Sequence, residues 1–379
     1  MLYVPVVDAN QNPLMPTTAN RAASWIRSKK ATPFWKRGIF CVRLNVEPSA
    51  RNIQTIALGI DPGSKKEGYT AKSEAHTFLN IQADAVTWVK DAVETRRNLR
   101  RSRRNRKTPY RKCRWNRGVG FRPERGLEVI KDKINDANVE LSDATKDRLP
   151  PSTRARWGWK LRIANWLQKM YPINVFVVED ISAETKKGCK RWNKSFSPLE
   201  VGKKWFYKQL SKLGKVETKE GWETFEMRNA SGLKKSKSKM SEVFEAHCVD
   251  SWTLANWWTG GHIKPDYTRM LCVTPLRFHR RQLHVCNPTE GNVRKPYGGT
   301  RSEGFTRGSL VEHINRGLAY VGGTSNGRIS LHEVATGKRL GQSFKPEDCK
   351  FRSFNTWRTR LLPPQREPWS LGIQCYAEK

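Results

Sequence analysis

The segment from Arg96 to Arg117 limits the possible folds of this chain more than any other. It contains twelve Lys or Arg in twenty-two positions and no acidic residue. Arg is a good helix former, so we expect one helix from about Ala85 to Lys107, ending before Pro109. Like charges at i, i+4 spacing destabilise an isolated helix. The helix should therefore be ordered mainly when phosphates surround it, because a solvated charge run would leave twelve cations uncompensated.

The rest of the chain carries the same excess of positive charge. Its 379 residues include 71 Lys plus Arg against 35 Asp plus Glu, a formal net charge of +36. Such a charge favours a polyanionic partner, and its spread along the whole chain favours nucleic acid over a membrane surface. No apolar run approaches the roughly 20 residues of a membrane span, and the N-terminus lacks signal-peptide features. Eight single cysteines without a C-x-x-C pair argue against a zinc ribbon.

Two segments have the patterns of strands that end near a carboxylate. The apolar residues of 53–61 alternate, so Asp61 shares a strand face with Ala57 and Gly59, and these small residues would leave room for a metal ion and a phosphate. The segment 173–181 is apolar on both faces, as in a central strand of a covered sheet, and Glu179 lies near its end. Taken alone, Asp61 could be a turn former and Glu179 a strand-end charge.

A third pair of candidate residues lies on a helix expected from Ser241 to Trp258. His247 and Asp250 are three residues apart and therefore share one helical face, although they could also be a satisfied polar face. Hard cations such as Mg²⁺ take oxygen ligands, and two such ions catalyse phosphodiester hydrolysis. We therefore expect Asp61, Glu179 and Asp250 to hold two Mg²⁺, with Mn²⁺ as a substitute. His247 is expected to be catalytic, either as a ligand or in proton transfer.

The order of these motifs resembles a split RuvC-type nuclease of the RNase H fold. The chain as a whole resembles the OMEGA family of transposon-encoded, RNA-guided proteins that includes IscB and IsrB. The matching motifs are PLMP at 13–16, GIDPG at 59–63, VVE at 177–179, HCVD at 247–250, and the arginine run, which resembles a bridge helix. One departure is Ser251, where Ala is more usual in the family.

The chain also departs from IscB, which carries an HNH nuclease between the second and third RuvC motifs. Only 67 residues separate Glu179 from His247, and none of them is a histidine, the general base of an HNH centre. The resemblance therefore points to the HNH-lacking IsrB branch. The four-cysteine zinc site of the related TnpB nucleases has no counterpart among the scattered cysteines.

The resemblance implies an α/β protein with an RNase H-like (RuvC) core that an Arg-rich bridge helix splits. The core would follow a small N-terminal domain and precede a β-rich C-terminal module, in which Asn326-Gly327 predicts a hairpin turn. The expected domains are 1–52 PLMP, 53–84 RuvC part I, 85–118 bridge helix, 119–200 RuvC part II, 201–259 RuvC part III, and 260–379 C-terminal module for the RNA scaffold and the target-adjacent motif.

The resemblance also implies a function. A large guide RNA (omega RNA) would pair with one strand of double-stranded DNA beside a short flanking motif, and the RuvC site would nick the displaced strand. The protein would be a monomer in a cytoplasmic ribonucleoprotein of a prokaryotic cell, nucleoid-associated on DNA. The expected nucleic-acid contacts are Arg96, Arg97, Arg100, Arg101, Arg103, Arg104, Arg106, Lys107, Arg111, Lys112, Arg114, Arg277, Arg280 and Arg281. Two alternatives remain: an RNA-independent junction resolvase, and a non-catalytic RNA-binding protein.

Overall fold

A computed structural model describes residues 3–48, 51, 54–107, 149–180, 202–276, 301–334, 336–354 and 357–362. Two compact units divide the chain, one comprising Met1–Val86 with Ala155–Lys379 and the other comprising Thr87–Arg154. In the part that is described, no helix combines the length and the hydropathy that a membrane span requires.

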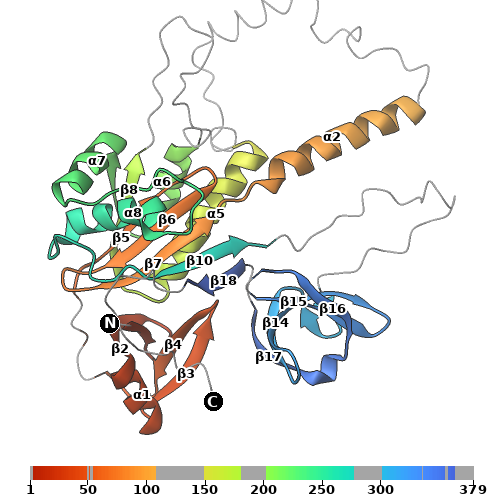
Figure 1. The fold of residues 1–379 in the computed structure, drawn as a ribbon, viewed down its shortest axis with the longest axis horizontal. Helices are drawn as coiled ribbons and strands as arrows, with labels where there is room; N and C mark the ends of the chain where they lie inside the picture. Colours follow the sequence, from red (N-terminus) through yellow and green to blue (C-terminus); the bar gives the residue numbers. More distant parts are fainter. Residues whose placement is uncertain are drawn as a thin grey trace, which may run out of the picture. The chain divides into compact units, whose positions relative to one another are not determined.

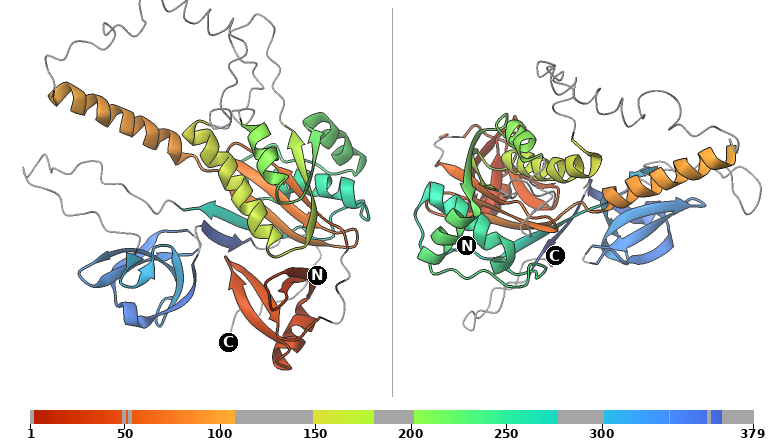
Figure 2. Two further views of the ribbon diagram at one scale, coloured as in Figure 1. Left: turned by 180° about the vertical axis from the view of Figure 1, so that it is seen from behind. Right: turned by 90° about the horizontal axis from the view of Figure 1, so that it is seen from above.

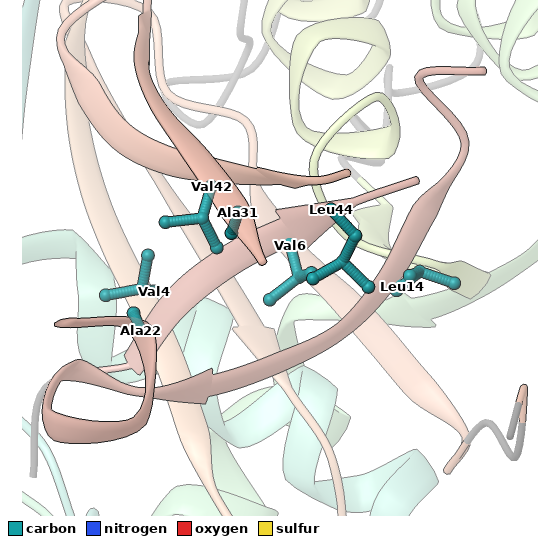
Figure 3. Close-up of a cluster of buried hydrophobic side chains, with 7 residues drawn as sticks. All are labelled: Val4, Val6, Leu14, Ala22, Ala31, Val42 and Leu44. Carbon is teal, nitrogen blue, oxygen red and sulfur yellow. The ribbon is translucent and has the colours of Figure 1, made fainter. Parts of the chain in front are cut away.

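The first four strands form a sheet of their own, in the order β2-β1-β4-β3. The elements are β1 (Tyr3–Val7), β2 (Pro13–Thr18), α1 (Ala19–Arg27), β3 (Ala31–Lys36) and β4 (Ile39–Leu44). Seven buried side chains join the sheet to α1, namely Val4, Val6, Leu14, Ala22, Ala31, Val42 and Leu44 (Figure 3). The turn-rich pattern of residues 10–16 predicts no strand there, but β2 begins at Pro13. An edge strand tolerates proline because its missing N–H need not reach a partner.

A seven-stranded sheet forms the centre of the larger unit, in the order β18-β10-β7-β6-β5-β8-β9 (Figure 1). Its strands are β5 (Ile56–Asp61), β6 (Lys66–Lys72), β7 (Thr77–Asp84), β8 (Ile173–Asp180), β9 (Lys215–Glu220), β10 (Met270–Pro275) and β18 (Trp357–Leu361). β5 pairs antiparallel with β6 and parallel with β8, and β8 pairs parallel with β9. The prediction of a mixed α/β fold is confirmed.

Helices cover both faces of this sheet (Figure 2). They are α5 (Pro151–Gln168), α6 (Lys203–Leu210), α7 (Gly221–Ala230) and α8 (Phe244–Thr259). On one face, Leu254 and Ala255 of α8 pack against Val175 and Val177 of β8. On the other face, Trp157 of α5 stacks on the ring of a phenylalanine in α6, with ring centroids 4.8 Å apart. The side chains of β5 and β8 therefore alternate between two covered layers, as the apolar pattern of residues 173–181 predicts.

The C-terminal region contributes strands to three sheets, the smallest of which consists of β11 (Arg301–Ser302) and β12 (Phe305–Thr306). Five strands form an antiparallel sheet in the order β16-β15-β14-β13-β17 around a small core that includes Val311 and Leu331. These strands are β13 (Ser309–His313), β14 (Gly317–Ser325), β15 (Arg328–Glu333), β16 (Arg339–Phe344) and β17 (Cys349–Phe354). Asn326 and Gly327 both have positive φ angles, 51° and 71°, in the turn between β14 and β15. The hairpin turn expected at these two residues is present.

Two strands from the same region belong to the central sheet. β10 pairs in parallel with β7, and β18 pairs antiparallel with β10. The sequence places residues 260–379 in one separate module, because their composition changes near residue 260. The structure instead places β10 and β18 at the edge of the central sheet, and the five-stranded sheet lies between these two strands in the sequence. Trp357 of β18 is fully buried against Trp159 and Trp166 of α5, which are core residues as expected.

Among the described residues of the smaller unit, 87–107 include the long helix α2 (Trp88–Lys107). It begins three residues after the expected start at Ala85 and reaches the expected end at Lys107. Arg96, Arg97, Arg100 and Arg101 are exposed on it. The backbones of Arg103, Arg104, Arg106 and Lys107 belong to the same helix, while their side chains lie outside the described part.

Candidate active site

Two carboxylates lie side by side at one edge of the central sheet. Asp61 is the last residue of β5, and Glu179 is the penultimate residue of the neighbouring strand β8. The strands are parallel and in register, with Gly59 opposite Val177, so their carboxyl ends meet at the same edge. The Asp61 and Glu179 side chains share a hydrogen bond. The next carboxylate, Asp180, has the opposite orientation and binds Tyr207 of α6 at 2.8 Å.

Helix α8 places two further polar side chains at this edge. His247 Nδ1 lies 3.0 Å from Asp61 Oδ2, and His247 Nε2 lies 3.0 Å from the main-chain carbonyl oxygen of Lys239. Both partners accept hydrogen bonds, so both ring nitrogens donate and the imidazole is cationic. Asp250 is one helical turn further along, has no exposed surface, and acts electrostatically on Glu179. The structure thus brings together all four residues that the sequence proposes for the centre.

Glycines in the sheet allow α8 to approach so closely. A Cβ atom at Gly59 would overlap the carbonyl group of Ser251, and one at Gly68 would overlap that of His247. The expectation that Ala57 and Gly59 leave room for a metal ion and a phosphate is therefore wrong. The backbone of α8 fills that space, and the small residues serve to bring His247 and Asp250 to the sheet.

The buried carboxylates have opposite pKa shifts. Burial raises the pKa of Asp61, but the hydrogen bond from His247 and the nearby Lys235 ammonium outweigh it and hold that pKa below its usual value. Burial and the negative charge of Asp61 raise the pKa of Glu179 to about 9. Burial lowers the pKa of His247, but the hydrogen bond to Asp61, the negative charge of Asp61 and the hydrogen bond to the Lys239 carbonyl together raise it above its usual value. At neutral pH the pair of carboxylates therefore holds one proton, on Glu179.

Two cations hold Asp250. Arg228, near the end of α7, donates from Nη1 to Asp250 Oδ1 at 2.5 Å. Lys235, in the segment between α7 and α8, donates from Nζ to Asp250 Oδ2. Each carboxylate oxygen of this fully buried residue therefore has one charged donor. Neither cation is a candidate from the sequence, which marks residues 228–240 only as a basic loop, and no spacing to Asp250 distinguishes them.

A buried ion pair supports the site from the opposite face of the sheet. Lys160 of α5 and Glu67 of β6 both have fully buried side chains and form a salt bridge. Lys160 Nζ also donates to the carbonyl oxygen of Gly63 at 3.1 Å, in the turn that follows Asp61. Removing one partner from a buried pair leaves an uncompensated charge, so α5 and the Asp61 turn are fixed to each other.

The donor set suits a divalent cation although it is not arranged as a finished ligand cluster. Across the described residues, no three His, Cys, Asp or Glu side chains are grouped closely enough to hold an ion. Both carboxylate oxygens of Asp250 bind the cations Arg228 and Lys235, and this partly explains why the carboxylates are not grouped around one point. Hard cations prefer carboxylate oxygens, and three carboxylate side chains meet at this one sheet edge. Asp61, Glu179 and Asp250 therefore fit Mg²⁺ by chemistry.

Several expected nucleic-acid contacts lie outside the described residues. These are Arg111, Lys112, Arg114, Arg277, Arg280 and Arg281, together with the side chains of Arg103, Arg104, Arg106 and Lys107. The described contacts expected on the bridge helix, Arg96, Arg97, Arg100 and Arg101, belong to the compact unit 87–154, whereas the carboxylate centre belongs to the other unit.

Fold and site define a mixed α/β protein with a buried carboxylate centre at the end of two parallel strands. The model of the RRXRR protein family matches residues 4–127. The chain carries this pattern at residues 100–104, RRSRR. The family is found in IscB- and IsrB-type proteins, so this part of the chain fits a relative of that nuclease group. No curated protein matches the chain.

Proposed function

We propose that this protein is an RNA-guided DNA nickase with one RuvC-type nuclease centre of the RNase H fold. The observation that carries the proposal is the convergence of Asp61, Glu179, His247 and Asp250 from three distant segments onto one buried sheet edge. The topology of five neighbouring strands, β7-β6-β5-β8-β9, supports it. If the five are numbered in chain order from β5, they lie in the order 3-2-1-4-5, and only strand 2 (β6) is antiparallel to the others, as in the RNase H fold. The family match at residues 4–127 supports the kinship with IscB- and IsrB-type proteins.

In this proposal Asp61, Glu179 and Asp250 hold two Mg²⁺. When bound, these ions would activate water and stabilise the leaving 3′ oxygen of the cut strand. The protein residues have separate tasks. The Asp61–His247 hydrogen bond fixes the imidazole, and the second ring nitrogen donates to the Lys239 carbonyl oxygen, so both nitrogens of His247 are engaged as donors. We propose that it passes a proton to or from the reacting oxygen atoms.

The guide RNA would supply sequence recognition by pairing with the target strand, as it does in other RNA-guided nucleases. The arginines of α2 would hold RNA phosphates. Only the displaced strand would enter the carboxylate centre. The stretch between Glu179 and His247, which has no histidine, provides no second nuclease centre of the HNH type. The protein would therefore cut only one of the two DNA strands.

The direct test is to express the protein with its native flanking DNA and sequence the RNA that stays bound at high salt. The recovered ribonucleoprotein is then given DNA labelled separately on each strand, with Mg²⁺ or EDTA. We expect one abundant RNA with a variable guide, and a Mg²⁺-dependent nick in the non-target strand alone. Cleavage of four-way junctions without RNA would instead favour a resolvase. Stable RNA binding without any cleavage would favour a non-catalytic RNA-binding protein.

Metal binding at this centre should release protons. Glu179 has a pKa of about 9 without metal, so it is protonated at neutral pH and must ionise to become a ligand. We therefore expect metal affinity to rise as the pH increases from 6 towards about 9. Calorimetric titration with Mn²⁺ at pH 7, in buffers of different ionisation enthalpy, should show up to about one proton released per protein. The Glu179→Gln variant, which has no ionisable group at this position, should lose this release, while Glu226→Gln on the surface of α7 should keep it.

Exposed aromatic side chains border the centre and suit unpaired bases. Helix α7 begins at Gly221, where a Cβ atom would lie 3.6 Å from Glu179 Oε1. Trp222 follows and is 59% exposed, and Phe225 is 53% exposed, with the guanidinium group of Arg228 5.4 Å from its ring centroid. Aromatic faces bind single strands by stacking on successive bases. These two rings would guide the displaced strand towards the carboxylates.

The Trp222→Ala variant should bind single-stranded DNA more weakly by about 1–3 kcal/mol, the usual value for one stacked base. Fluorescence anisotropy with a labelled oligonucleotide measures the change. Trp35→Ala is a matched control, because Trp35 is 57% exposed but lies on the N-terminal sheet. Equal losses in both variants would contradict a specific role for α7.

A further inference from the structure

The segment from Leu233 to Val243, between α7 and α8, lies over the carboxylate centre and is called here the strap. It has no helix or strand of its own. The Lys239 carbonyl oxygen accepts from His247 Nε2 at 3.0 Å, and the Ser241 carbonyl oxygen accepts from Gln82 Nε2 at 3.0 Å. The ends of the strap are fixed more firmly, because Leu233 packs against a buried cluster and Glu242 forms salt bridges with Lys66 and Arg360.

One side chain of the strap enters the centre. The ammonium group of Lys235 binds Asp250 and interacts electrostatically with Asp61 and Glu179 as well. It thus contacts one of the three carboxylates that are proposed to hold Mg²⁺ and acts on the other two through its charge. Its neighbours in the strap do not share this position, since Lys234 and Lys237 make no contact with these carboxylates among those found for the described residues.

Lys235 differs in mobility from the second cation on Asp250. Arg228 belongs to a helix, is almost completely buried, and binds one oxygen with a planar guanidinium group. Lys235 belongs to the irregular strap, and its side chain is 30% exposed. An ammonium on a flexible four-carbon stem can leave its partner by bond rotation alone. Of the two cations on Asp250, Lys235 is the one that can be displaced without unfolding an element.

We propose that Lys235 is an internal counter-cation of the nuclease centre, which competes with the divalent ion for Asp250 and leaves Asp250 when the centre is loaded. This inference rests on the proposed function, since it assumes that metal ions bind to these carboxylates. The physical reason is electrostatic: an ammonium and a divalent cation a few ångströms apart repel each other strongly in a poorly solvated site. A divalent ion would therefore occupy Asp250 only at the concentration that displaces the ammonium.

The competition can be measured at the site itself by iron-directed cleavage of the full-length chain. Fe²⁺ replaces Mg²⁺, and ascorbate with peroxide then generates radicals that cut the backbone beside the bound ion. The fraction of chain cut near Asp61 is followed as the Fe²⁺ concentration rises. Asp61→Asn is the blank, because it removes a proposed ligand. This readout detects the occupied site and needs no DNA cleavage.

We expect the Lys235→Gln variant to reach half-maximal cutting at an Fe²⁺ concentration at least tenfold lower than the unaltered protein. Lys235→Arg keeps the positive charge and should stay within about threefold of the unaltered value. Lys234→Gln and Lys237→Gln remove charge from the strap without touching the carboxylates and should also leave the value unchanged. Circular dichroism and thermal melting check that each variant is folded.

Each other outcome has a definite meaning. If Lys235→Gln has an unchanged or higher half-maximal Fe²⁺ concentration, and Asp61→Asn still abolishes cutting, the proposed competition is wrong. The proposed metal centre would then still be supported. The same would follow if Lys234→Gln or Lys237→Gln produced an equal gain, because the effect would then be general charge. No cutting near Asp61 in any variant would instead contradict the proposed metal centre.

Discussion

The Asp61→Asn variant should lose nicking by about three orders of magnitude or more, while it keeps its RNA. A bound metal ion contributes several kcal/mol to the transition state of phosphodiester hydrolysis, and each 1.36 kcal/mol is worth a factor of ten in rate. Asn has the size of Asp and can still accept the hydrogen bond from His247, so the fold of the centre should be preserved. It lacks the negative charge on which both the cationic imidazole and the metal ion depend. Single-turnover nicking of the displaced strand, with Mg²⁺ in excess, measures the loss.

The control for Asp61→Asn is Glu226→Gln, which removes a carboxylate from the exposed surface of α7. It should nick at the unaltered rate. RNA content and melting temperature of both variants should match the unaltered protein, because the cations expected to bind RNA lie elsewhere. If Asp61→Asn nicked normally, the carboxylate centre would not be the nuclease. If it lost RNA as well, the defect would be structural and a catalytic role would not follow.

The parts of the fold that follow from local pattern were predictable. β5 and β8 are apolar runs, and the geometry of a parallel pair brings Asp61 and Glu179 to one edge. His247 and Asp250 share a face because of their helical spacing alone. The cations on Asp250 were not predictable, since Arg228 and Lys235 reach it through tertiary packing and not through any local repeat.

Long-range pairing explains the other differences. The sequence of residues 270–275 does not reveal that this strand pairs with β7, which lies more than 180 residues earlier in the chain. Parallel strands are not joined by a short turn, so no local turn signal marks the pairing. The region from 260 onward therefore looks like one module, although its strands β10 and β18 belong to the central sheet. The small residues Ala57 and Gly59 illustrate a related limit: they signal a close approach, but only the structure shows that the approaching group is the backbone of α8.

Replacing Arg96, Arg97, Arg100 and Arg101 together with Gln should weaken RNA binding and flatten its salt dependence. All four side chains are exposed on α2, in two i, i+4 pairs that lie on one side of the helix. Each phosphate that the protein no longer neutralises reduces the slope of log affinity against log salt by about 0.7 for a single strand and about 0.9 for a duplex. If every arginine holds one phosphate, the slope should fall by about three to four. Filter binding of the recovered RNA over a series of salt concentrations measures it.

A second quadruple variant tests whether RNA binding depends on the position of the positive charges or only on the net charge of the protein. Arg27, Lys29, Arg328 and Lys338 are exposed and lie outside α2, so changing these four to Gln removes the same formal charge. If RNA binding depends only on the net charge of +36, the salt dependence will flatten equally in both quadruple variants. If α2 is the element that tracks the RNA backbone, the slope will fall by several units in its variant and by about one or none in the other. The second result would also explain why α2 is so rich in arginine. The like charges of the helix repel each other, water and salt do not fully screen this repulsion, and bound phosphates would offset it.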